Sequence, residues 1–166
     1  MLTALVSCGK ETGAPEGMKL LCSRDTYIVY VPERWAVDDS SLAYAHSTDY
    51  RLNDKKAFYA SVQILEHTLG EKSMDDFVSD YVANLKAEFK TKFNSDAPIG
   101  YEKGNIKGKV ITYSIEKADG KELYKSTLIE DDGMVIELRY IAMNIDGLYE
   151  KNINDYNMIV ENIYLK

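Results

Sequence analysis

Three closely spaced β-strand patterns, separated by two Asp-Gly pairs, constrain the fold of this chain more than any other feature. The residues that mark the three strands are, in order, Ile111, Tyr113 and Ile115, then Leu123, Thr127 and Ile129, then Met134, Ile136, Leu138 and Tyr140. The pairs Asp119-Gly120 and Asp132-Gly133 separate them, and Asp-Gly is a strong hairpin signal because both residues tolerate positive φ. The pattern therefore predicts an antiparallel meander.

Three further strand patterns precede the meander. Residues 26–31 are rich in β-branched and aromatic side chains and stop at Pro32, which is typical of a strand. A short strand is expected over residues 43–46. Residues 58–64 alternate between apolar and polar side chains, so this strand is predicted to rest one face on a core.

An amphipathic helix is expected from about Met74 to Lys90, with Ser73 as its N-cap and Asp75 and Asp76 in its first turn. Its apolar residues recur at helical spacing and are Met74, Phe77, Val78, Tyr81, Val82, Leu85 and Phe89. A C-terminal helix is indicated by Tyr149, Ile153, Tyr156, Val160 and Ile163. Apolar stripes of this kind usually pack on a core.

The order of these elements predicts one α+β domain, a single antiparallel sheet with helices packed on it. Between the first helix and the meander, residues 94–108 are polar and contain glycine, with one short strand expected near Tyr101. The chain is 45% hydrophobic and 28% charged, which is typical of globular proteins. We find no internal repeat and no pattern of a second domain.

The net charge of −7 argues against a nucleic-acid partner, because such affinity depends mostly on neutralising phosphates with Lys and Arg. Lys86, Lys90 and Lys92 are candidates for a basic face. They also lie at the predicted end of a helix, where cations complement the helix dipole. The second interpretation is preferred.

The segment Leu5-Val6-Ser7-Cys8-Gly9 resembles the lipobox of bacterial lipoproteins. The resemblance implies that Cys8 is diacylated and becomes the first mature residue, anchored in the cell membrane and facing outside the cytoplasm. Only four residues precede the box and none is basic, so we expect residues 1–8 to be the remnant of a longer signal peptide. A chance match in an ordinary N-terminus is the alternative.

Residues 9–23 are expected to form a flexible tether, followed by a globular domain over 24–166. The first part of this tether has Gly, Pro and charge and almost no apolar content, so it cannot bury enough surface to fold. If Cys8 is lipidated, Cys22 is left alone and buried or inert. If it is not, a disulfide between the two cysteines is conceivable.

The strand that runs into Pro32-Glu33-Arg34-Trp35, together with the order of the later elements, resembles the PsbP/Mog1-like superfamily of α/β/α sandwich domains. The likeness covers residues 24–166. It implies an accessory subunit or a binding protein rather than an enzyme, and bacterial members include secreted lipoproteins of undefined role. Other helix-on-sheet classes, such as cystatin-like and NTF2-like domains, are the main rivals.

Catalytic and metal-binding motifs are absent from the sequence. The two histidines, His46 and His67, lack the spacing of a zinc pair, and no nucleophile elbow or phosphate-binding loop is present. The acidic segments 38–39 and 130–133 lack the twelve-residue calcium-loop pattern and are expected to be solvated. We predict no cofactor, no metal site and no catalytic residue.

Thirteen tyrosines suit half-buried sheet surfaces, so packing is the first interpretation. A row on an open sheet face would instead form a platform for a ligand, and the candidates are Tyr27, Tyr59, Tyr113, Tyr124 and Tyr140.

Two functional hypotheses follow. The first is a non-enzymatic binding or accessory module, tethered to the membrane through Cys8, whose partner is an envelope protein or a small extracellular ligand. The alternative is an enzyme or metal-dependent factor whose site is assembled from His46, His67 and nearby acids.

Overall fold

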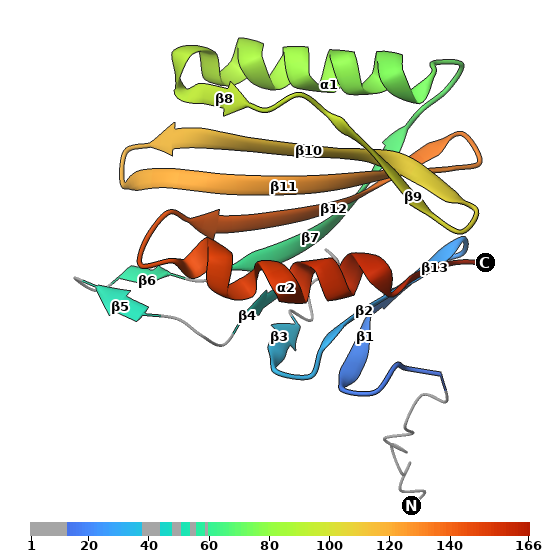
Figure 1. Cartoon of the computed structure of the whole chain (residues 1–166), viewed down its shortest axis with the longest axis horizontal. Coiled ribbons are helices and arrows are strands. Elements are labelled where there is room, and N and C mark those ends of the chain that lie inside the picture. Colours follow the sequence, from blue (N-terminus) through green and yellow to red (C-terminus); the bar gives the residue numbers. More distant parts are fainter. Residues whose placement is uncertain (1–12, 38–43, 48–50, 54–55, 59) are drawn as a thin grey trace, which may run out of the picture.

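The computed structural model describes residues 13–37, 44–47, 51–53, 56–58 and 60–166. An eight-stranded antiparallel sheet forms the body of the protein (Figure 1). Its strands, in order across the sheet, are β3 (Trp35–Val37), β4 (Tyr44–Ser47), β7 (Ser61–Thr68), β12 (Met134–Met143), β11 (Gly120–Asp131), β10 (Ile106–Lys117) and β8 (Phe93–Ser95), and β9 (Ile99–Lys103) pairs with β10 as well.

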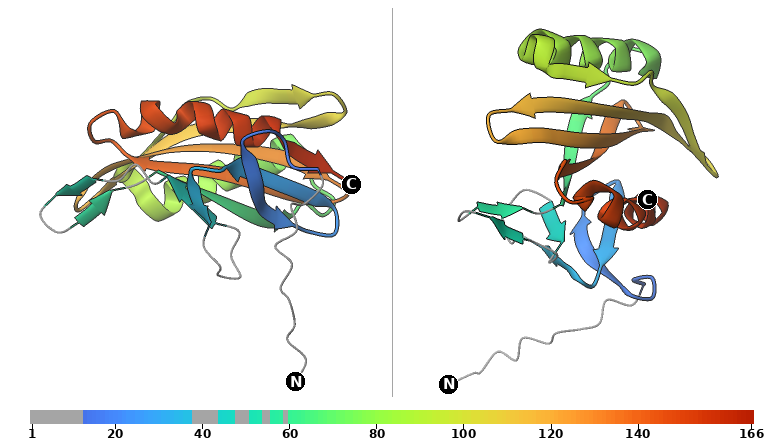
Figure 2. Two further views of the ribbon diagram at one scale, coloured as in Figure 1. Left: turned by 90° about the horizontal axis from the view of Figure 1, so that it is seen from below. Right: turned by 60° about the vertical axis from the view of Figure 1, so that its left-hand side comes forward.

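Two helices, α1 (Met74–Phe89) and α2 (Leu148–Glu161), cover opposite faces of this sheet (Figure 2). A single 3₁₀ turn, η1 (Lys90–Lys92), follows α1 and leads into β8. No helix of the described residues is long and apolar enough to cross a membrane.

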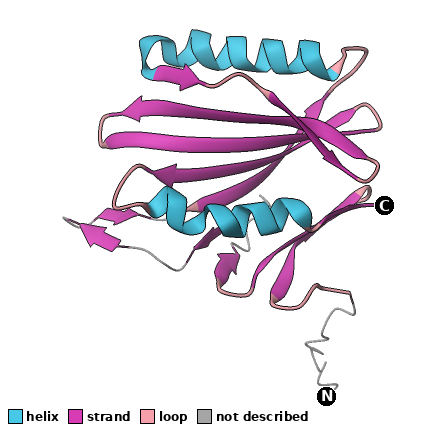
Figure 3. Ribbon diagram, in the orientation of Figure 1, coloured by secondary structure: helices cyan, strands magenta, loops and turns pink. Residues whose placement is uncertain are grey.

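Two smaller sheets correct the expectation of a single sheet (Figure 3). The first contains β1 (Met18–Ser23), β2 (Tyr27–Pro32) and β13 (Ile163–Leu165), and the second is the hairpin of β5 (Arg51–Asn53) and β6 (Lys56–Phe58). Alternating side chains identify a strand but do not identify its partner, so the sequence pattern could not separate the sheets. The expected class, strands with helices packed on them, is otherwise present.

The predicted meander is confirmed as β10, β11 and β12, paired antiparallel along nearly their whole lengths. Asp132 and Gly133 form the two-residue loop between the last two strands, because Asp131 pairs with Met134. Their φ angles are 42° and 77°, the positive values that a type I′ turn requires. The Asp-Gly signal therefore located this hairpin correctly.

Helix α1 also follows its prediction. The side chain of Ser73 accepts a hydrogen bond of 3.1 Å from the backbone N–H of Asp76. Helix α2 is shorter than expected, because it ends at Glu161 and Ile163 belongs to β13. Ile163 pairs with Val29 of β2 and is fully buried. The helix therefore ends where strand pairing begins, although the helical spacing of apolar residues continues to Ile163.

Part of the segment expected to be a flexible tether, residues 9–23, is a strand of the folded domain. Its last six residues form β1, which pairs with β2. Met18 and Leu21 are buried in the core. The strand was missed because residues 18–22 were grouped with the polar stretch before them, although their own composition is apolar.

Two apolar clusters hold the helices to the sheet. The larger includes Trp35, Tyr140, Tyr156 and Ile159 and lies on the α2 face, where the small sheet of β1, β2 and β13 also packs. The smaller lies between α1 and the strands of the meander. Polar groups interrupt this second cluster, and they form the candidate site.

Candidate functional site

A glutamate lies at the centre of the interface between α1 and the large sheet. Glu137 is in the middle of β12 and its side chain is 0% exposed. Its neighbours along the same face of the strand are Val135 and Arg139, because alternate residues of a strand share a face. A buried carboxylate is costly unless it is paired and hydrogen-bonded, so its partners decide what this site can do.

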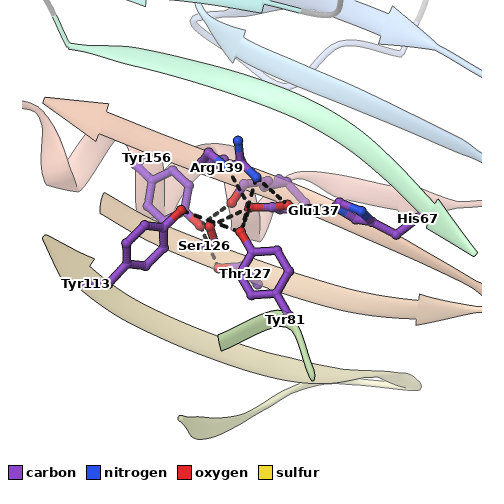
Figure 4. Close-up of polar contacts among 9 residues, drawn as sticks. His67, Tyr81, Tyr113, Ser126, Thr127, Glu137, Arg139 and Tyr156 are labelled. Carbon is purple, nitrogen blue, oxygen red and sulfur yellow. Dashed lines mark hydrogen bonds and ion pairs between the residues drawn. The ribbon is translucent and has the colours of Figure 1, made fainter. Parts of the chain in front are cut away.

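Both carboxylate oxygens of Glu137 are occupied (Figure 4). Oε1 accepts hydrogen bonds from Ser126 Oγ at 2.6 Å, Arg139 Nε at 2.7 Å and Tyr81 OH at 2.8 Å. Oε2 contacts Arg139 Nη2 at 3.0 Å and His67 Nε2 at 2.7 Å. The guanidinium therefore holds the carboxylate at two points, the geometry that makes such pairs strong.

These contacts set the protonation of Glu137. Burial by itself would raise its pKa, but the hydrogen bond from His67, the charge of Arg139 and the hydrogen bond from Ser126 lower the pKa to about 2. The glutamate is thus ionised at neutral pH and can only accept hydrogen bonds. His67 Nε2 must then be the donor, which fixes a proton on that nitrogen.

Four secondary-structure elements bring the site together. Tyr81 reaches it from α1, His67 from β7, Ser126 from β11, and Glu137 with Arg139 from β12. The phenol of Tyr81 also accepts a hydrogen bond of 3.1 Å from Arg139 Nη2. Burial and the nearby negative charge of Glu137 raise the pKa of Tyr81, so its hydroxyl stays protonated.

Aromatic rings close the site on two sides. His67 lies 5.7 Å and 6.0 Å from the ring centroids of Phe77 and Tyr81 of α1. On the other side Tyr113 stacks on Tyr124, with centroids 4.6 Å apart and planes 8° from parallel. The helix and the stacked rings therefore flank the network, while the side chains of His67 and Arg139 stay 28% and 22% exposed.

The order of the polar groups does not match a catalytic triad. In a triad the histidine lies between the nucleophile and the acid and takes the nucleophile's proton. Here Glu137 lies between Ser126 and His67, and the serine hydroxyl donates to the carboxylate. Ser126 is also fully buried. The arrangement therefore binds α1 to the sheet.

The two histidines named in the sequence analysis lie in different parts of the structure. His67 joins the Glu137 network, whereas His46 lies on β4, near Tyr44 at 6.0 Å between ring centroids. Among the described residues no group of three or more His, Cys, Asp or Glu could hold a metal ion. Cys8 and the acids at 38–39 lie outside the described residues.

Cys22 lies on β1 and is half-buried. Burial raises the pKa of its thiol to about 11, so the reactive thiolate is scarce at neutral pH. The acidic turn at 130–133 leads from β11 to β12.

The tyrosines do not line up on one open face. Tyr113 and Tyr124 are buried under α1, and Tyr140 is buried between Tyr149 and Tyr156 of α2. Tyr27 is also buried, and its hydroxyl donates to Glu66 at 2.7 Å. Tyr59 lies outside the described residues. Packing is therefore the role of the four that are described.

The sequence analysis missed Glu137, Arg139, Tyr81 and Ser126 as members of a site. A signal for two of them was present, because Glu137 and Arg139 are charged residues at alternate positions of an otherwise apolar strand. On an exposed face such residues are ordinary. Only the helix packed over this face turns them into a buried ion pair.

No family model matches this sequence, and no curated protein matches it. Solved structures do match. A Pseudomonas aeruginosa protein of unknown function, PA94, aligns with a TM-score of 0.62 at 13% identity, over 87% of this chain and 94% of that one.

Two further solved structures match over most of their length. The cyanobacterial PsbP protein of Synechocystis aligns with a TM-score of 0.62 at 9% identity, over 98% of this chain and 99% of that one. LpqN of Mycobacterium tuberculosis, a protein involved in cell envelope biogenesis, aligns with a TM-score of 0.56 at 15% identity, over 84% of this chain and 83% of that one. At these identities the likeness concerns the fold alone, and the fold of this chain is PsbP-like.

Proposed function

We propose that this chain is an extracytoplasmic lipoprotein, tethered to the membrane through Cys8, that acts as a non-enzymatic binding or accessory module. The non-enzymatic role is supported by one observation, the full set of hydrogen bonds to Glu137. Its two oxygens accept hydrogen bonds from four side chains, so its capacity as an acceptor is already used within the protein. A carboxylate engaged in this way stabilises the packing of α1 on the sheet rather than taking part in catalysis.

Two observations support a location outside the cytoplasm. The sequence Leu5-Val6-Ser7-Cys8 resembles a lipobox, and LpqN, which shares the fold, is involved in cell envelope biogenesis. Two acyl chains anchor a protein stably whereas one does not, so a diacylated Cys8 would be a sufficient anchor.

The first experiment measures the N-terminus. The chain is expressed in a bacterium with its native upstream sequence, membranes are separated, and the intact mass of the N-terminal peptide is determined. We expect diacylglycerol on Cys8 and removal of everything before it. Cys8→Ser should leave the protein uncleaved, while the control Cys22→Ser should be processed normally. An unmodified start in the soluble fraction would overturn the proposed tether.

A second experiment addresses the alternative, an enzyme or metal-dependent factor built around the histidines. Elemental analysis of the purified protein and thermal melts with added divalent metals are compared for wild type and His46→Ala/His67→Ala. We expect no stoichiometric metal and no metal-dependent stabilisation in either. A metal that binds the wild type but not the double variant would contradict the non-enzymatic binding role and support the metal-dependent alternative.

A further inference from the structure

A half-buried lysine lies on the α2 face of the sheet without a counter-charge. Lys125 is in β11, where its neighbour Tyr124 packs under α1, so the alternation of side chains places Lys125 on the opposite face. Its Nζ donates a hydrogen bond of 3.0 Å to Asn157 Oδ1 and lies 5.6 Å from the centroid of the Tyr156 ring, both on α2. The amide oxygen and the ring face both favour the charged ammonium.

No carboxylate neutralises this ammonium in the described part of the chain. Lys125 forms no ion pair there, although several other lysines and arginines do. Burial lowers the pKa of Lys125, and no nearby acid raises it. The net charge of the chain is −7, so acids are plentiful, yet none of the described ones pairs with Lys125. A partly desolvated cation without a counter-charge costs free energy, which an anionic ligand would recover.

Other hydrogen-bond donors adjoin the ammonium. Nζ carries three N–H groups and uses one of them on Asn157. The Nδ2 group of the same amide makes no hydrogen bond to a described residue. Thr112 of β10 pairs with Lys125, so its hydroxyl is on the same face of the sheet. One ammonium with neutral donors beside it matches a carboxylate, which has a single charge and two acceptor oxygens.

A hollow of about 210 Å³ borders Lys125 on the same face. Its lining includes Thr112, which is opposite Lys125, and Leu123, which precedes Lys125 by two residues on β11. Tyr149 of α2 belongs to the lining as well. The hollow therefore offers an aliphatic side chain and an aromatic ring next to a cation.

Acids limit what can enter this hollow. Asp96 and Glu150 also line it, and neither raises the pKa of Lys125, so both lie away from the ammonium. They repel an anionic group placed in the hollow. A ligand would therefore direct its charged end to Lys125 and lay its uncharged part on Leu123 and Tyr149.

We propose that Lys125 binds the carboxylate of an aliphatic ligand whose alkyl part occupies the hollow beside it. This chemistry is shared by free short-chain fatty acids and by the C-terminal carboxylate of a polypeptide with an apolar last residue. Asn157 would add a hydrogen bond from its amide N–H. This inference rests on the proposed binding role and names the ligand class for it.

The test is a titration of the full chain followed by nuclear magnetic resonance. The probes are hexanoate and its neutral counterpart 1-hexanol, then N-acetyl-leucine and its amide. We expect the two carboxylates to shift the amides of Thr112, Leu123 and Asn157, and the neutral probes to cause much smaller shifts. Bound hexanoate should also raise the pKa of Lys125, read from its Cε signal, because an ion pair favours the ammonium. Tighter binding of N-acetyl-leucine would indicate a polypeptide source, and tighter binding of hexanoate a free acid.

Three variants locate the binding. Lys125→Met should weaken the binding of hexanoate about tenfold, because it removes a hydrogen bond to a charged group while keeping most of the side-chain length. Lys125→Arg keeps the charge and should retain most of the affinity. The matched control is Lys107→Met at an exposed position of β10, which changes the net charge equally and should bind hexanoate as the wild type does.

The proposal is overturned if Lys125→Met binds hexanoate as tightly as Lys107→Met does, or if hexanoate leaves the pKa of Lys125 unchanged. The second measurement uses the wild type, so it decides the question even if a variant fails to fold. Failure here would leave the tether proposal intact, because the lipid on Cys8 is measured independently by mass.

Discussion

The two faces of the large sheet hold their helices by different means. Helix α2 buries five residues, and its contacts with the core are mainly apolar. Helix α1 buries only Val78, and beneath it lies an ionised carboxylate with an arginine. Apolar burial stabilises a helix at any pH, whereas a buried ion pair fixes geometry and depends on pH. The comparison predicts that α1 is the more easily detached helix.

Polar groups on the α2 face form smaller clusters. Asp155 accepts a hydrogen bond of 2.7 Å from the indole N–H of Trp35 and forms an ion pair with Arg34, whose side chain is mostly exposed. The hydroxyls of Thr127 and Tyr156 are 2.7 Å apart. On the α1 face five side chains share one carboxylate network, so the loss of one member affects all of them.

Trp35→Ala should have the largest effect on the α2 face. The ring is fully buried, and loss of a core aromatic costs about 3–5 kcal/mol. Chemical denaturation followed by far-UV circular dichroism measures the change. Trp35→Phe keeps most of the ring volume and removes only the N–H to Asp155, so it should cost clearly less. Equal losses for both variants would show that the hydrogen bond, not packing, dominates this face.

Glu137→Ala should have a comparable effect on the α1 face. Removal of one partner of a buried ion pair costs about 3–5 kcal/mol, because Arg139 is left without its counter-charge. The same unfolding measurement is applied to the control Glu130→Ala, an exposed acid on the neighbouring strand β11. If the two alanine variants were equally stable, the network would contribute nothing to the interface.

Acid should weaken the α1 face through Glu137. The pKa of Glu137 is about 2 in the folded protein and 4.5 when the side chain is unperturbed, as in the unfolded chain. Its contribution to the free energy of unfolding is therefore complete above pH 4.5. That contribution, about 3 kcal/mol, is lost as the pH falls from 4.5 to 2. Urea unfolding at several pH values, read from the fluorescence of Trp35, measures the slope. In Glu137→Gln this component of the pH dependence should disappear, and its persistence would assign it to other acids.

Ser73→Ala should have the smallest effect and should be confined to α1. Loss of an N-cap side chain costs about 1 kcal/mol. Hydrogen exchange should then quicken in the amides of α1 more than in those of α2. Ser79→Ala, at an exposed position in the middle of the same helix, should not weaken it. An equal rise in the exchange rates of both helices would mean that they unfold as one unit. That result would contradict the expectation that α1 detaches more easily than α2.

Local signals predicted a large part of the fold. The meander, its Asp132-Gly133 turn and helix α1 with its Ser73 cap all depend on residues close together in the chain. Such features are encoded by periodicity and by the φ preferences of turn residues. They needed no knowledge of the partner strands.

The candidate site was predicted poorly for the opposite reason. His67 is one of the two histidines that the sequence draws attention to, but its partner Glu137 is 70 residues away in sequence. Burial and charge pairing of this kind arise only when distant segments pack.

The sequence by itself determined that this chain has strands, a capped amphipathic helix and a meander, because those patterns are local. It also contains the lipobox-like segment at Cys8, whose role rests on the proposed experiment. The tertiary structure decided the division into three sheets, the fate of Ile163 in β13 and the conversion of Glu137 from a strand residue into a buried ion. The reason is physical: strand partners, helix cover and dielectric surroundings are properties of contacts between segments far apart in the chain.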